Sequence, residues 1–68
     1  MSVANISWFR AMTDKLAGFG EDLKEHKRLG MDADHVAEFV LWFVLPYASR
    51  HGLAISEKLS RFMEEADL

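Results

Sequence analysis

The chain has 68 residues, of which half are hydrophobic and none is cysteine, and its formal net charge is −3. This length makes one domain, residues 1–68, that hides only about 60% of its unfolded surface, and the absence of cysteine excludes stabilisation by disulfides or thiolate metal sites. The apolar content excludes a disordered chain, and the interspersed charges do not form the basic cluster of a generic nucleic-acid binder, so burial against a second chain is the expected source of further stability.

The first predicted helix runs from about residue 5 to residue 29. Its large apolar residues follow the 3-4 spacing typical of a buried helical seam: Phe9, Met12, Leu16, Phe19 and Leu23, with His26 next. Gly18 and Gly20 each disfavour a helix by about 1 kcal/mol relative to alanine. The spacing nevertheless continues across both glycines, so we expect one helix, which the glycines either bend or open to another helix. Gly30 is expected to end it in a left-handed conformation.

The second predicted helix begins after Asp32 or Asp34, either of which suits an N-cap, and continues to about Arg50, ahead of Gly52. At 100° per residue, one broad face of this helix carries Val36, Phe39, Val40, Phe43, Val44 and Tyr47. We expect that face to pack against the other two helices. Asp34, Glu38 and Ser49 mark the opposite, solvent-facing side.

A second apolar patch lies within that wetter sector, where Leu41, Trp42 and Leu45 stand beside Glu38. Leaving three large apolar side chains in water would forgo about 5–8 kcal/mol, which is comparable to the stability of a small domain. We interpret the patch as an interface, most simply that of a two-fold homodimer in which Glu38 sets the register. The alternative is that the first or third helix wraps far enough round to cover it.

Pro46 lies inside the second helix and lacks the N–H that would bond to the carbonyl of Trp42, so it is predicted to kink the helix or to end it early. Ser56 is expected to cap a third helix, with Glu57 favourably placed in its first turn. The apolar positions of that helix are Leu59, Phe62, Met63 and Ala66, with Ile55 just before it. The predicted fold is all-α: a compact three-helix unit with a long N-terminal helix, a hydrophobic central helix and a short C-terminal helix, in a homodimeric bundle.

The sequence offers little catalytic or metal-binding chemistry. His35 and Glu38 have the i, i+3 spacing of a metal site, but in the reverse order of the Glu-x-x-His motif of di-iron bundles. Asp32 and Asp34 lack the glycine and the distal glutamate of a calcium loop, and no nucleophile elbow surrounds any serine. We therefore expect neither an enzyme nor a metal, a cofactor or a small-molecule substrate.

Membranes and DNA are also disfavoured as partners. Trp8, Phe9 and Arg10 have the composition of a membrane-surface segment, but the acidic groups of the same helix oppose anionic lipid, so Trp8 is interpreted as a core-edge or partner contact. The longest apolar run is about half of the roughly 20 residues that span a bilayer, and no secretory signal is visible, so a cytoplasmic location is predicted. The acidic end of the third helix disfavours a helix-turn-helix DNA reader.

The sequence therefore predicts a small regulatory protein, not an enzyme, that acts by protein–protein binding. An inhibitor or anti-activator of a host transcription or motility component, of bacterial or phage accessory type, is an example. Its expected partners are a second copy and another protein, and the interface residues are Glu38, Leu41, Trp42, Leu45 and Trp8. One alternative is a structural or assembly homodimer without an inhibitory role. A less favoured one is a nucleic-acid-binding regulator that uses the local basic group Lys24, Lys27 and Arg28.

Overall fold

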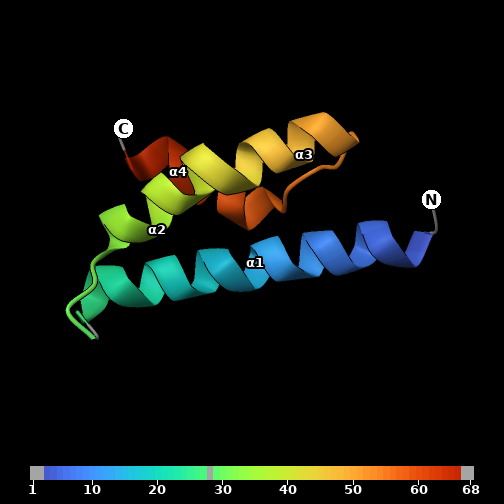
Figure 1. The fold of residues 1–68 in the computed structure, drawn as a ribbon. Helices are drawn as coiled ribbons and strands as arrows, with labels where there is room; N and C mark the ends of the chain where they lie inside the picture. Colours follow the sequence, from blue (N-terminus) through green and yellow to red (C-terminus); the bar gives the residue numbers. More distant parts are fainter. Residues whose placement is uncertain (1–2, 28, 67–68) are drawn as a thin grey trace.

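The computed structural model describes residues 3–27 and 29–66, which fold into helices as predicted (Figure 1). The elements are α1 (Val3–Glu25), α2 (Ala33–Phe39), the π-helix η1 (Val40–Val44), α3 (Leu45–His51) and α4 (Glu57–Ala66). Since α2, η1 and α3 follow one another without a break, they form one rod, called here the central helix. The all-α fold with a long, a central and a short helical segment is thus confirmed, and Arg28 lies outside the described residues.

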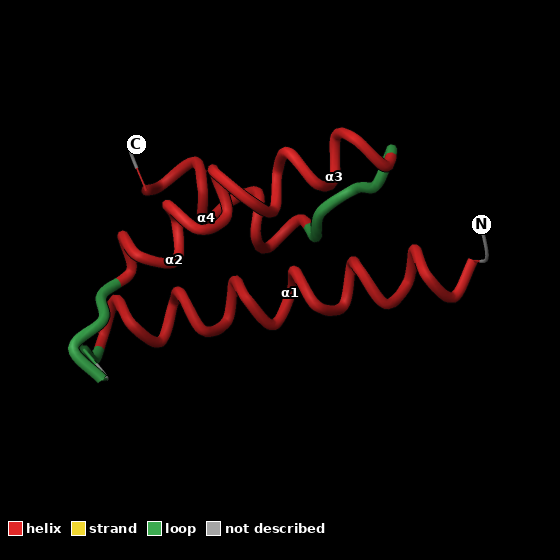
Figure 2. The backbone as a smooth tube through the Cα atoms, viewed as in Figure 1, coloured by secondary structure: helices red, strands yellow, loops and turns green. Residues whose placement is uncertain are grey.

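The three segments pack around a core at the α2 end of the central helix. The central helix runs back along α1 in the opposite direction, and its α3 end diverges from the N-terminal part of α1 (Figure 2). α4 packs against both α1 and α2. α1 and α4 therefore cover the α2 end of the central helix.

Small residues on α1 allow α4 to come close. α1 is a single helix through both glycines, as predicted, and Phe9 and Leu23 are buried in its seam. Between them the buried positions are Thr13, Ala17 and Gly20. The prediction that Phe19 and His26 continue the seam is wrong, because both are exposed. The buried line of α1 runs through its small residues, which leave room for large side chains from α4.

Gly20 is one of these contact points. A Cβ atom on Gly20 would lie 2.6 Å from Cζ of Phe62, a core residue of α4 that is almost fully buried. Gly18 differs, since a Cβ atom there would meet only the flexible Lys58 side chain, with its Nζ 3.7 Å away. The predicted role of a glycine in helix approach therefore belongs to Gly20.

A buried hydrogen-bond chain joins the start of α4 to α1. The Ser56 N–H donates to Oγ1 of Thr13 at 2.9 Å, and the Thr13 hydroxyl donates to the Arg10 carbonyl at 2.9 Å. Ser56 Oγ in turn accepts from the Leu59 N–H at 3.1 Å, which confirms Ser56 as the cap of α4. Thr13 and Ser56 are both buried. Because the cap of one helix is bonded to the side chain of another, the position of α4 along α1 is fixed.

The ends of the central helix follow the predicted capping residues. Oδ1 of Asp32 accepts from the Asp34 N–H, and the Asp32 N–H donates to Nδ1 of His35, both at 3.2 Å. Gly52 closes the helix with a φ of 65°. α1 ends at Glu25, earlier than predicted, and Gly30 adopts a left-handed φ of 71° in the turn that follows.

Pro46 does not end the central helix. The residues before it form the π-helix η1, in which the Leu45 N–H donates to the carbonyl of Val40, five residues back. Pro46 then falls in the first turn of α3. A wider turn before a proline accommodates its missing N–H and its ring, which otherwise clashes with the carbonyl four residues earlier. The helix therefore accommodates Pro46 by a local widening of its turns and continues past it.

Replacing Gly20 by alanine is expected to destabilise the protein by about 1–2 kcal/mol. Overpacking against Phe62 costs about 1–3 kcal/mol, of which helix propensity returns up to about 1 kcal/mol. Gly18→Ala is the matched control, because the same propensity gain occurs there without a clash. Urea unfolding followed by circular dichroism measures both variants. Equal stabilisation of the two would contradict the close approach of α4 at Gly20.

Replacing Thr13 by valine is expected to cost about 1–3 kcal/mol of unfolding free energy, because the buried Ser56 N–H loses its acceptor while the shape of the side chain is kept. Thr13→Ser keeps the hydroxyl and removes one methyl group, so its loss should be smaller, about 1 kcal/mol. Urea titration compares the two variants. If valine were tolerated better than serine at this position, the hydrogen bond would not hold α4 in place.

Candidate protein-binding surface

Two parallel stripes of apolar residues run along the central helix, and only one of them is buried. The buried stripe consists of Val36, Val40, Val44 and Ala48, and Ala37 beside it is buried as well. The second stripe consists of Phe39, Phe43 and Tyr47, which are 49%, 65% and 49% exposed. The prediction that one broad face packs against the other helices is correct for the three valines, which are buried. It is wrong for Phe39 and Phe43, which among the described residues stack only on each other, and correct in part for Tyr47, which is half exposed but stacks on Phe9 of α1. These aromatic residues form an exposed surface, although their spacing predicts a place in the core.

The spacing of the residues explains the separation of the stripes. Both stripes repeat every four residues, and in an α-helix such a repeat drifts by about 40° per step. A π-turn is wider than an α-turn, so a four-residue repeat drifts less within η1 than it does in α2 and α3. Valine and alanine on the covered side let α1 and α4 approach, whereas the larger aromatic rings are left on the open side.

The open side forms a groove between α1 and the central helix, named here the aromatic groove. It encloses about 320 Å³ and is lined by Trp8, Phe9, Met12, Phe39, Phe43, Val44 and Tyr47. Phe9 and Val44 are buried core residues, and Trp8 on α1 is 65% exposed. The groove is therefore a place where the hydrophobic core reaches the surface.

Stacked rings order the walls of the aromatic groove. The rings of Phe9 and Tyr47 are 5.8 Å apart between centroids, with 24° between their planes. Those of Phe39 and Phe43 are 5.5 Å apart at 27°. His51 lies against Tyr47 at the far end, with 4.4 Å between the ring centroids. Each exposed ring of the central-helix wall is thus held by an aromatic neighbour in the same chain.

The predicted interface residues do not all come together. Trp8 belongs to the aromatic groove, but Trp42 and Leu41 are not among the residues that line it. Trp42 is 69% exposed and Leu41 is 38% exposed, whereas Leu45 is half-buried and packs against the core. The exposed side that carries Leu41 and Trp42, with Glu38 one turn earlier, is named here the Trp42 side.

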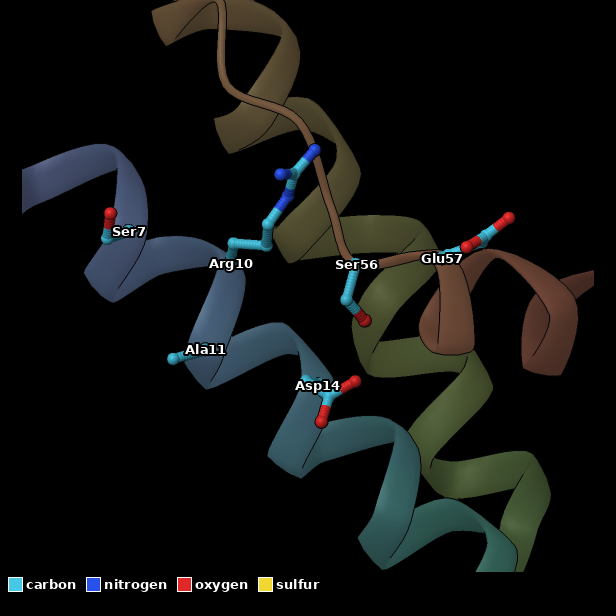
Figure 3. Close-up of a pocket in the computed structure, with 6 residues that line it drawn as sticks. All are labelled: Ser7, Arg10, Ala11, Asp14, Ser56 and Glu57. Carbon is cyan, nitrogen blue, oxygen red and sulfur yellow. The ribbon is translucent and has the colours of Figure 1, made fainter. Parts of the chain in front are cut away.

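A second hollow, more polar, lies between α1 and the start of α4 (Figure 3). It is lined by Ser7, Arg10, Ala11, Asp14, Ser56 and Glu57. The Ser56 hydroxyl is already engaged in the helix cap, and the Glu57 side chain points away from α1. Among the described residues, every buried side-chain nitrogen or oxygen has a hydrogen-bond partner. This hollow therefore contains no buried side-chain polar group without a hydrogen-bond partner.

The three histidines lie apart in the structure. Nδ1 of His35 lies 3.0 Å from Oδ1 of Asp32 within the helix cap, and His26 is 3.9 Å from the Glu25 carboxylate. His51 stacks on Tyr47. Within residues 3–27 and 29–66, no three histidine, aspartate or glutamate side chains gather to hold a metal ion. His35 belongs to the cap of the central helix, while Glu38 is exposed and takes no part in that cap.

The local basic group is partly neutralised by acidic neighbours. Nζ of Lys24 lies 2.8 Å from Oε1 of Glu65 on α4 and 3.8 Å from the Glu21 carboxylate. The hydrogen bond to Glu65 raises the pKa of Lys24, and the same bond lowers the pKa of Glu65. Lys27 is exposed, and Arg28 lies outside the described residues. Lys24, the first of the three basic residues, is thus already paired with Glu65 of α4.

Comparisons of the chain with models of protein families, with curated proteins and with solved structures find no match. In the part of the chain that the structure describes, no helix is both long enough and apolar enough to cross a membrane. A function for this protein is therefore inferred from its surface, of which the aromatic groove and the Trp42 side are the outstanding features.

Proposed function

We propose that this chain is a small regulatory protein, not an enzyme, that acts by binding another protein, and that it works as a homodimer. The observation that carries the proposal is the exposed aromatic surface: Trp8, Phe39, Trp42, Phe43 and Tyr47 are each about half exposed or more. Aromatic residues, tryptophan above all, dominate the binding energy of protein interfaces. Exposed apolar patches of this kind mark binding surfaces in small domains.

The Trp42 side has the features of a compact binding epitope. Trp42 projects from a rigid helix, Leu41 adds apolar area beside it, and Leu45 anchors the same turn to the core. The exposed carboxylate of Glu38 lies one turn earlier and is suited to pairing with a cation of the partner. Binding of this kind inhibits when the covered surface is one that the partner needs for another contact. An inhibitor or anti-activator of a transcription or motility component is the function we favour.

A structural or assembly homodimer is the second candidate. It is favoured by the lining of the aromatic groove, whose side chains are apolar apart from the Tyr47 hydroxyl and the Trp8 indole N–H. Interfaces of permanent dimers resemble a domain core cut in half, and this groove continues the core. The two candidates differ in whether the Trp42 side is needed to bind a different protein.

Trp42→Ala is expected to weaken binding of the partner protein about 30-fold or more, because a hot-spot tryptophan contributes about 2 kcal/mol or more. The partner is first captured from a lysate of the source cells, and the purified pair is then titrated by calorimetry. Leu29→Ala is the matched control, since Leu29 is a fully exposed apolar residue in the turn after α1. Unchanged affinity for Trp42→Ala would contradict this epitope, and a homodimer that captures no partner would favour the structural role.

A further inference from the structure

We infer that the aromatic groove is the surface through which two copies of this chain meet, and that the Trp42 side remains free for a different protein. The inference rests on the proposed homodimer and names the face that it uses. The starting observation is that Phe43 and Trp42 are neighbours in sequence with nearly equal exposure, 65% and 69%, yet only Phe43 lines the groove.

The composition of the groove fits a second copy better than a partner that binds and leaves. No charged side chain lines it, and its buried residues Phe9 and Val44 belong to the core. Transient interfaces are about as polar as the rest of a protein surface, whereas homodimer interfaces are more apolar and resemble a divided core. If the groove of a second copy covered this groove, the hydrophobic cores of the two chains would become continuous.

The exposed aromatic area supplies a large share of what a dimer interface needs. An aromatic side chain offers about 150–250 Å², so the exposed parts of Trp8, Phe39, Phe43 and Tyr47 together amount to roughly 450 Å². This is more than half of the about 800 Å² that each partner buries in a stable interface. A smaller hollow beside the groove, lined by Trp8, Ala11, Met12 and Lys15, extends the contact surface along α1.

The groove is already ordered before a second copy arrives. The stacked pairs Phe9–Tyr47 and Phe39–Phe43 fix the rings of one wall. Ordered side chains lose little conformational entropy on binding, so more of the free energy of apolar burial appears as affinity.

A two-fold dimer also uses each contact twice. A single change at the centre of the groove is therefore felt on both sides of the interface.

The test compares Phe43→Lys with Trp42→Lys, each studied by sedimentation equilibrium and by size-exclusion chromatography with light scattering. We expect the wild-type chain and Trp42→Lys to be dimers. Phe43→Lys should raise the dimer dissociation constant at least 100-fold, because it places two lysines inside one apolar interface. Circular dichroism confirms that each variant is folded. If Phe43→Lys is not, Trp8→Lys, which changes the opposite wall, replaces it with the same expectation.

The contrary outcomes are distinct. A dimer that survives Phe43→Lys and Trp8→Lys, or one that Trp42→Lys dissociates, would overturn the assignment of the groove to the second copy. A wild-type chain that stays monomeric at millimolar concentration would overturn the homodimer itself. The proposed binding of another protein is read separately, from the titration of Trp42→Ala. Failure of the groove assignment is therefore distinguishable from failure of the proposed function.

Discussion

The close contact of α4 with the small residues of α1 decides which parts of this molecule are buried. Gly20 admits the ring of Phe62, and Thr13 accepts the N–H of Ser56, so α4 has one position against α1. The central helix must then pack on the surface that these two helices share. Within the described residues, this packing leaves the aromatic residues Phe39, Trp42, Phe43 and Tyr47 of the central helix exposed.

The exposed surface follows from that packing. The central helix carries apolar side chains on most of its circumference, but only the stripe of valines and Ala48, with Ala37 beside it, is buried. Since α3 diverges from α1, the second stripe and Trp8 enclose the aromatic groove. Trp42 projects on yet another side. The aromatic groove and the exposed Trp42 lie on different sides of the central helix. This arrangement supports the proposal of a dimer that also binds another protein.

The helices and their caps were predictable because their signals are local. Asp32, Ser56 and Gly52 act on the backbone within a few residues, and each has the predicted role. The faces were less predictable. A helical wheel places the aromatic stripe and the valine stripe on one apolar face and does not show that only the valine stripe is buried. A seam defined by large residues overlooks Thr13 and Gly20. A strict four-residue spacing before a proline was the available signal for the π-turn. The dimer, the partner and the function remain predictions.

The fluorescence of Trp8 tests the central claim most directly. In a Trp42→Phe chain, Trp8 is the single tryptophan, and its emission is recorded over a range of concentrations while light scattering gives the mass. We predict the blue-shifted emission of a buried indole wherever the mass is that of two chains, and a red shift as the mass falls to one chain. The emission of a water-exposed indole in a sample with the mass of two chains would contradict the account.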